Sequence, residues 1–137
     1  MFEIGISDEF EAAHSLKGDF GPATRMHGHT YRVEVSIEAH DVDENGTFYD
    51  LGKLRSGLRA VLDELHYRDL NLVEGLKESN TTAEMVALYI FKKMEPPLRG
   101  SLAASLKVTV WESPSVFASY RAGVTGAGDR GPGAGGQ

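Results

Sequence analysis

From Met26 to His40 the sequence reads MHGHTYRVEVSIEAH. Apolar and polar residues alternate through this stretch, and successive side chains of a β-strand point to opposite faces of the sheet. Residues 30–40 are therefore predicted to form a strand with one buried and one solvated face, as in an antiparallel sheet. The predicted buried face carries His27, His29, Tyr31, Val33, Val35, Ile37 and Ala39.

A third histidine lies at the end of another predicted strand, the first fourteen residues. His14 is in phase with the apolar residues Phe2, Ile4, Ile6, Phe10 and Ala12. Three neutral imidazoles without a fourth protein ligand suit a catalytic zinc ion, which keeps one position open for water or substrate. We interpret His14, His27 and His29 as zinc ligands. The alternative is that they are unrelated core or loop histidines.

The rest of the chain predicts two helices followed by two strands. Asp50 is a good helix N-cap, and apolar residues recur every three or four positions from Leu51 to Leu65. The sequence Thr81-Thr82-Ala83-Glu84 fits a capping box that opens a second helix. Strands are expected around 106–112 and 117–121. This order favours an α+β fold, a four-stranded antiparallel sheet with two helices on one face.

Chain length and composition indicate one globular domain. The chain has 137 residues, of which 41% are hydrophobic and 25% are charged. Residues 1–122 are predicted to form this domain, and the Gly-rich segment 123–137 is predicted to be a disordered tail. A four-stranded sheet has two open edges, which pairing with other subunits would cover, so a homo-oligomer is expected.

Charge and cysteine content exclude several function classes. The formal net charge is -6 and there is no long basic run, which argues against a nucleic-acid partner. The absence of cysteine excludes disulfides, thiolate metal sites and a cysteine nucleophile. No stretch approaches transmembrane length, and the N-terminus lacks the pattern of a signal peptide. We expect a cytoplasmic protein without a membrane partner.

Several other residues are candidates for a functional site. Glu112 follows the inward phase of its strand; it is either solvated at a strand end or accepts hydrogen bonds from a ligand with adjacent N–H groups. Thr81 and Thr82 are helix caps beside backbone N–H groups that can hold polar ligand atoms. His66 near Asp69 is a candidate general base, or a histidine favoured by the helix dipole.

An ordered set of motifs resembles the family of 6-pyruvoyl-tetrahydropterin synthase and 6-carboxytetrahydropterin synthase, the second of which belongs to the queuosine pathway. The resemblance extends over roughly residues 2 to 122. Each motif alone is modest, but their order and spacing are specific. The motifs are residues 10–14, 27–31, 45–51, 70–71, 80–84 and 111–113.

The resemblance implies a tunnelling fold, in which trimers form a barrel and commonly pair as hexamers. It implies Zn²⁺ on the three histidines and Glu112 as the anchor of the pterin ring, with Thr81 and Thr82 nearby. The implied activity is a zinc-dependent lyase acting on the side chain of a dihydropterin such as 7,8-dihydroneopterin triphosphate. Pyruvoyl-type members eliminate triphosphate, and carboxy-type members cleave the side chain.

The sequence departs from the family pattern at the acid–base residues. The family cysteine, four positions before the His-Gly-His motif, is Ala23 here, and the family Asp-His pair aligns with His66-Tyr67. His66, oriented by Asp69, is a candidate replacement base. Two functions therefore remain open. One is a lyase with altered or weak activity, and the other is a non-catalytic zinc-containing protein that binds a pterin or purine.

Overall fold

The computed structural model describes residues 1–127 and confirms the predicted order of strands and helices. Short 3-10 turns lie at Gly21–Thr24, Leu70–Leu72 and Pro96–Leu98. The strands and helices are β1 (Phe2–His14), β2 (His27–Ala39), α1 (Leu51–Asp63), α2 (Ala83–Met94), β3 (Ser105–Ser113) and β4 (Val116–Gly123).

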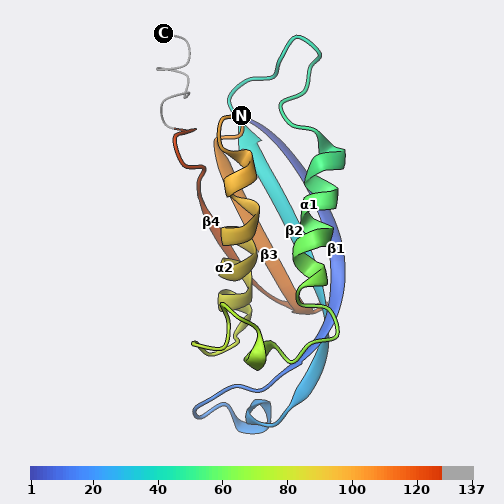
Figure 1. The fold of residues 1–137 in the computed structure, drawn as a ribbon, viewed down its shortest axis with the longest axis vertical. Coiled ribbons are helices and arrows are strands. Elements are labelled where there is room, and N and C mark those ends of the chain that lie inside the picture. The colour runs from blue at the N-terminus through green and yellow to red at the C-terminus, as the bar shows by residue number, and fades with distance from the viewer. Residues whose placement is uncertain (128–137) are drawn as a thin grey trace.

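The strands form one antiparallel sheet in the order β1-β2-β3-β4. Both helices cover the same face of this sheet, with α2 over β3 and β4 and α1 beside β1 (Figure 1). The predicted α+β architecture is therefore confirmed. The long loop between β1 and β2 extends from the end of the sheet opposite the chain's N-terminus (Figure 1).

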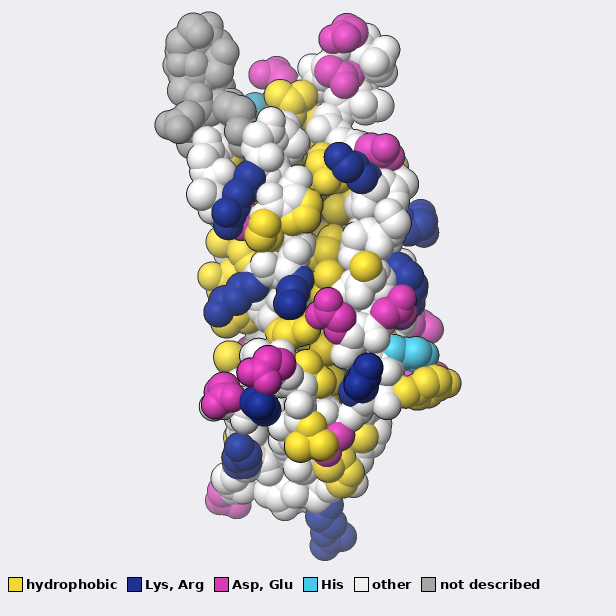
Figure 2. Space-filling model, viewed as in Figure 1, with side chains coloured by type: hydrophobic (Ala, Val, Ile, Leu, Met, Phe, Trp, Pro, Cys, Tyr) yellow, Lys and Arg dark blue, Asp and Glu magenta, His cyan; other side chains and the backbone are white. Residues whose placement is uncertain are grey.

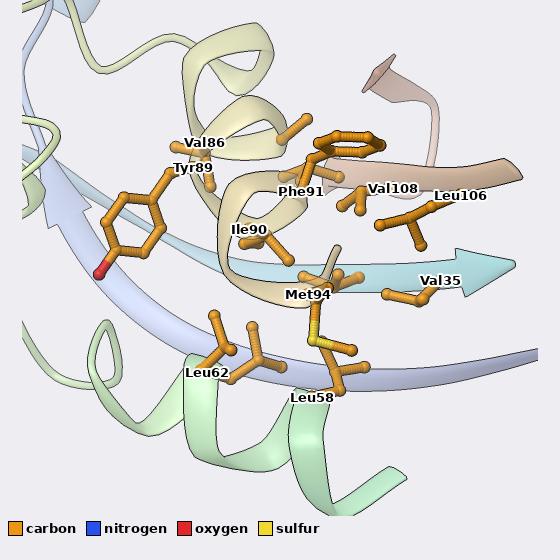
Figure 3. Packing of buried hydrophobic residues seen from close by; sticks show 14 of the residues in the cluster. Val35, Leu58, Leu62, Val86, Tyr89, Ile90, Phe91, Met94, Leu106 and Val108 are labelled. Atoms are coloured by element: carbon orange, nitrogen blue, oxygen red, sulfur yellow. The ribbon is translucent and has the colours of Figure 1, made fainter. Parts of the chain in front are cut away.

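The core lies between the sheet and the two helices. The inward side chains of β2 predicted from the alternation are fully buried from Tyr31 to Ala39. Leu58 and Leu62 of α1 meet Ile90 and Met94 of α2 above them (Figure 3). Burying one such side chain contributes roughly 1.5–3 kcal/mol. Apolar atoms remain visible in the seam between the two helices, whereas charged side chains surround it (Figure 2).

The helix N-termini show one confirmed and one wrong prediction. The Asp50 carboxylate accepts hydrogen bonds from the first turn of α1, as expected of an N-cap. In α2 the N-cap is Thr82, whose hydroxyl accepts from the Met85 N–H at 3.3 Å. Glu84 is then the second helical residue, so the predicted capping box with Thr81 as its cap does not form. Thr81 is left free for another contact.

The free edge of β1 is covered at its C-terminal end by the segment after α1. The Tyr67 N–H donates to the Glu11 carbonyl at 2.6 Å, and the Ala13 N–H donates to the Arg68 carbonyl at 3.0 Å. Tyr67 takes up a left-handed backbone conformation, with φ of 58°, to make this turn. These bonds fix the part of β1 that leads into His14.

The folded domain extends slightly further than the predicted boundary at residue 122. Val124 and Ala127 are buried, and the Thr125 N–H donates to the Glu95 carboxylate at 2.9 Å. Residues 123–127 therefore belong to the domain, because Val124 and Ala127 are buried in it and Thr125 is hydrogen-bonded to Glu95. The remainder of the predicted tail, 128–137, lies outside the described residues. Within residues 1–127, no helix is long and apolar enough to cross a membrane.

Candidate metal centre

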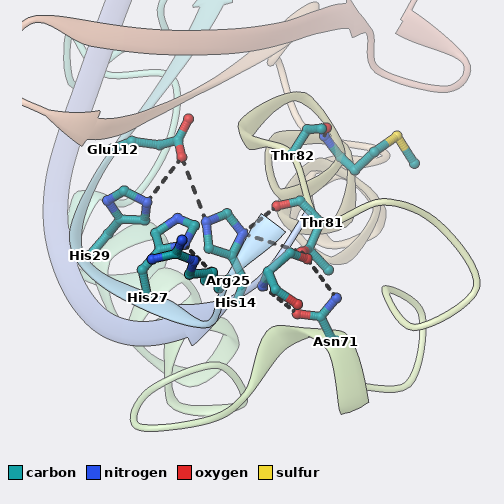
Figure 4. Close-up of polar contacts among 10 residues, drawn as sticks. His14, Arg25, His27, His29, Asn71, Thr81, Thr82 and Glu112 are labelled. Carbon is teal, nitrogen blue, oxygen red and sulfur yellow. Dashed lines mark hydrogen bonds and ion pairs between the residues drawn. The ribbon is translucent and has the colours of Figure 1, made fainter. Parts of the chain in front are cut away.

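The strand register brings the three predicted metal ligands together. His14 of β1 lies directly opposite His27 of β2, and His29 lies opposite Ala12. The ring centroids are 4.6 Å apart for His14 and His27, 5.1 Å for His14 and His29, and 4.9 Å for His27 and His29. One ring nitrogen of each imidazole lies within 4.8 Å of the others. The three histidines therefore form one cluster and are not unrelated core or loop residues (Figure 4).

Backbone carbonyls orient two of the imidazoles. His14 Nδ1 lies 2.7 Å from the carbonyl oxygen of Thr81, and His27 Nδ1 lies 2.7 Å from that of Arg25. A carbonyl oxygen only accepts hydrogen bonds, so each Nδ1 carries a proton and donates it. The Nε2 atom of each ring then holds a free lone pair. Metal-binding histidines are commonly held in this way.

Two of the ring nitrogens in the cluster are buried without hydrogen-bond partners. Within residues 1–127, Nε2 of His14 and Nε2 of His29 are buried without a hydrogen bond. A buried polar atom left in this state costs about 1–3 kcal/mol. Burial also lowers the pKa of His14 from its ordinary value, although the hydrogen bond to Thr81 opposes this, so the ring is held neutral. Neutral imidazoles with inward lone pairs fit a divalent cation such as zinc.

Glu112 points into the same site from β3. One of its carboxylate oxygens, Oε2, lies 3.3 Å from Nε2 of His29 and 3.9 Å from Nε2 of His14 (Figure 4). Its side chain is 24% exposed. The sequence left open whether this carboxylate is solvated at the strand end or directed inward. The structure shows that it faces the imidazoles.

Thr81 and Thr82 have different roles at the start of α2. Thr81 is fully buried, and both its carbonyl and its hydroxyl lie within hydrogen-bond distance of His14 Nδ1, at 2.7 and 3.2 Å. Thr82 caps α2 instead. Thr81 thus contacts the histidine cluster directly, whereas Thr82 caps the helix that positions Thr81.

Two asparagines hold the chain just after His14. The Asn71 side chain accepts from the Ser15 N–H at 2.8 Å and donates to the Ser15 carbonyl at 2.9 Å. Asn80 makes the same pair of bonds with Lys17, at 2.8 and 2.9 Å. Each side-chain amide thereby forms the two backbone hydrogen bonds that a neighbouring strand would otherwise provide. Both asparagines lie in the family-like motifs, but no local pattern in the sequence predicts these contacts.

The structure does not bring His66 and Asp69 together as a base and its orienting group. His66 Nδ1 accepts a hydrogen bond from the Glu11 N–H at 3.1 Å, so the lone pair of the neutral ring is engaged. The Asp69 carboxylate accepts from the Asn71 N–H at 3.0 Å. Among residues 1–127, no hydrogen bond or ion pair joins His66 or Asp69 to the other or to the imidazole cluster.

Two cavities lie near this part of the fold. A cavity of about 570 Å³ is lined by His29 and Asp69, together with Glu11, Tyr67 and neighbouring residues. A larger one, of about 780 Å³, lies between α2 and residues 64–75, and none of the three histidines lines it. The larger cavity therefore lacks the residues of the candidate metal centre, although its size alone would favour it as a ligand site.

The resemblance to the family places Ala23 at the position of the family cysteine. It belongs to the 3-10 turn Gly21–Thr24, and its carbonyl accepts from the Leu16 N–H at 2.9 Å. A methyl group cannot transfer a proton. Within the described residues, the only carboxylate that pairs with the imidazole cluster is that of Glu112.

Comparison with known proteins agrees with this geometry. Residues 3–123 match the family model described as 6-pyruvoyl tetrahydropterin synthase. The chain is 30% identical over 124 residues to the 6-pyruvoyl tetrahydrobiopterin synthase of Dictyostelium discoideum, covering 82% of this chain and 90% of that one. It is 27% identical over 144 residues to the 6-carboxy-5,6,7,8-tetrahydropterin synthase of Haemophilus influenzae, covering 88% and 99%.

Solved structures show the same fold. The 6-pyruvoyl tetrahydropterin synthase of Caenorhabditis elegans superposes with a TM-score of 0.77 at 31% identity, covering 88% of this chain and 95% of that one. The Plasmodium vivax enzyme superposes with a TM-score of 0.72 at 20% identity, a likeness of fold. The predicted tunnelling fold is confirmed by these neighbours, and the chain is a member of the 6-pyruvoyl tetrahydropterin synthase family, a family of lyases.

Proposed function

We propose that this protein is a metal-dependent lyase that acts on the side chain of a dihydropterin such as 7,8-dihydroneopterin triphosphate. The observation that carries the proposal is the convergence of three imidazoles, two of which have buried Nε2 atoms without hydrogen-bond partners. Family membership supports the substrate class, because the named relatives are tetrahydropterin synthases.

His14, His27 and His29 would hold the metal, which we propose to be zinc. When bound, zinc supplies a Lewis acid that acidifies substrate hydroxyls and polarises a carbonyl oxygen. The Glu112 carboxylate would accept hydrogen bonds from the N–H groups of the pterin ring. Thr81 keeps His14 in the tautomer that presents Nε2 to the site.

This chain departs from the family pattern at the residues for acid–base catalysis, Ala23 and His66-Tyr67. Loss of one general acid or base costs on the order of a hundred- to ten-thousand-fold in rate. Cleavage of the side chain by a retro-aldol route requires only deprotonation of a hydroxyl and protonation of the pterin carbon. We therefore propose a weak or altered lyase activity rather than the full rate of the family.

We further propose that the chain assembles as a homo-oligomer, a trimer or a hexamer. Within residues 1–127 the sheet has two edge strands, β1 and β4, and along β1 only residues near its C-terminal end pair with the segment after α1. Large apolar side chains are exposed on these strands, which supports burial against another subunit. They are Phe2, Val116, Phe117 and Tyr120.

Product analysis tests the proposed reaction. Zinc-loaded protein is incubated with 7,8-dihydroneopterin triphosphate, and the pterin products are separated by chromatography and identified by mass spectrometry. His27→Ala should abolish product formation, whereas His40→Ala should not, because His40 lies outside the cluster. The product mass separates triphosphate loss from side-chain cleavage. No product and no pterin binding would contradict the proposal.

A non-catalytic pterin- or purine-binding protein is the second candidate. Two observations favour it: Ala23 has no proton to transfer, and the His66 lone pair accepts a backbone hydrogen bond. This function keeps the metal centre and Glu112 but performs no chemistry. Tight binding of the pterin by the zinc-loaded protein without any product would support it over the lyase.

A further inference from the structure

We infer that Glu112 is a fourth metal ligand in the substrate-free protein and that a ligand must displace its carboxylate to reach the metal. This inference rests on the metal centre proposed above but not on the identity of the pterin. It gives Glu112 a role in addition to the proposed contact with the ring of the substrate.

One of the two distances from Glu112 to the imidazoles matches the separation of ligands of one ion, and the other is somewhat longer. In a tetrahedral zinc site with metal–ligand distances near 2.0–2.1 Å, neighbouring ligand atoms are separated by about 3.3–3.5 Å. Glu112 Oε2 lies 3.3 Å from His29 Nε2 and 3.9 Å from His14 Nε2. Yet both nitrogens lack a partner in hydrogen-bond geometry. The carboxylate is thus at the separation of a shared metal ligand from His29 and somewhat further from His14, without acting as a hydrogen-bond acceptor for either ring.

A local irregularity of the sheet supports this placement of the side chain. The register of β3 against β4 shifts between Trp111 and Ser113, with Glu112 at the irregularity. Bulges and similar irregularities re-aim side chains and are common beside functional sites. The pairing of β3 with β2 ends at Trp111, opposite Arg32, so Glu112 is also free of that ladder.

The inference has a chemical consequence for ligand binding. Three imidazoles and one carboxylate complete a four-coordinate zinc site, whereas catalytic sites keep one position for water or substrate. A Glu112 that binds the metal at rest cannot at the same time bind the N–H groups of a ligand. Arrival of a ligand would then transfer the carboxylate from the metal to the ligand and open the fourth position.

Metal binding without any pterin tests the inference. The full chain is titrated with Co²⁺, whose visible spectrum reports coordination number, and with Zn²⁺ in competition with a chelator. The variants are Glu112→Gln, which keeps the size of the side chain, and Glu112→Ala. Glu34→Gln is the matched control, because Glu34 is a carboxylate of the same sheet that bonds to Trp111 rather than to the imidazoles. Circular dichroism verifies folding of each protein.

We expect both Glu112 variants to bind metal about 10- to 100-fold more weakly than the wild type, by analogy with partners of metal ligands. Their cobalt spectra should change because a water molecule replaces the carboxylate, while Glu34→Gln keeps the wild-type spectrum. Equal affinity and an unchanged spectrum in a folded Glu112→Gln protein would overturn the inference and leave the three-histidine site intact. A wild-type protein that binds no metal would overturn both this inference and the proposed three-histidine metal site.

Discussion

His14 Nδ1 lies 2.7 Å from the carbonyl oxygen of Thr81, the residue that precedes the N-cap of α2. The end of β1 and the start of α2 are therefore joined through one of the three clustered imidazoles. Because a backbone carbonyl is the acceptor, this bond does not depend on the side chain at position 81. The tautomer of His14 is set by the fold itself.

The Asn71 amide should be important for metal binding because it holds the residue next to His14. Asn71→Ala removes two hydrogen bonds to Ser15, and we expect it to weaken metal binding by about tenfold. Asn80→Ala is the matched control, since it removes the same two bonds at Lys17, three residues beyond His14. Isothermal titration calorimetry measures the Zn²⁺ affinity of the two variants. Equal affinities of Asn71→Ala and Asn80→Ala would contradict a positioning role for Asn71.

The metal-free protein should lose stability as the pH falls below 6.5. Burial lowers the pKa of His14 from 6.5, so the unfolded chain takes up a proton at His14 before the folded chain does. Above pH 6.5 both states are neutral at this site, and His14 has no effect on the pH dependence. Below it, His14 contributes a slope of at most about 1.4 kcal/mol per pH unit.

Urea unfolding of the chelator-treated protein between pH 8 and pH 5 checks this expectation. His14→Gln should reduce the slope, because glutamine has no proton to bind in this range. His40→Gln, at a residue outside the cluster, serves as the control. A slope unaffected by His14→Gln would show that the ring is not held neutral by the fold.

Glu95 should stabilise the C-terminal end of the domain. Its side chain is buried, pairs with Arg99 and accepts from the Thr125 N–H. The hydrogen bonds from Arg99, more than that from Thr125, lower the pKa of Glu95 from 4.5 to about 2. Glu95→Gln should reduce the free energy of unfolding at neutral pH by about 1.5–3 kcal/mol, the range for hydrogen bonds to charged groups.

The pH dependence of this effect has a defined direction. Above pH 4.5 the carboxylate is charged in both states and its full stabilisation is present. As the pH falls from 4.5 towards 2, the unfolded chain is protonated first and the stabilisation is lost. Denaturant titrations at several pH values should show wild type and Glu95→Gln converging in acid, and a constant difference would be inconsistent with this account.

Restoring a cysteine at position 23 should raise the rate of the proposed reaction. Ala23→Cys reintroduces the acid–base group that the family pattern has there, and such a group contributes about a hundred- to ten-thousand-fold. Turnover of 7,8-dihydroneopterin triphosphate is measured for the wild type, Ala23→Cys and the neighbouring control Thr24→Cys. No gain in Ala23→Cys over Thr24→Cys would mean that residue 23 does not face the reacting atoms.

The sequence predicted the parts of the site that depend on strand periodicity. His27 and His29 share a phase with Tyr31, and His14 shares one with Phe10, so both sets had to face the core once the strands paired. The antiparallel register then places His14 opposite His27. The same alternation puts Glu112 in the inward phase but leaves open whether its carboxylate is solvated at the strand end, and the structure directs it to the imidazoles.

Contacts between distant segments were not predictable in the same way. The pairing of Asn71 and Asn80 with the chain after His14 depends on how two loops meet, and no local pattern encodes it. The two adjacent threonines both suit a cap; in the structure the Thr82 hydroxyl accepts from the Met85 N–H as the cap, whereas Thr81 contacts His14. Among the described residues no hydrogen bond joins the predicted pair His66 and Asp69, because each side chain accepts from a backbone N–H instead.

The zinc content of purified protein tests the central claim most directly. We expect one zinc ion per chain for the wild type and for His40→Ala, and almost none for His27→Ala, measured by elemental analysis after dialysis with folding verified by circular dichroism. His27 is chosen because it is partly exposed and its loss should not disrupt the core. Retention of zinc by His27→Ala, or its absence from the wild type after incubation with zinc, would contradict the three-histidine metal centre.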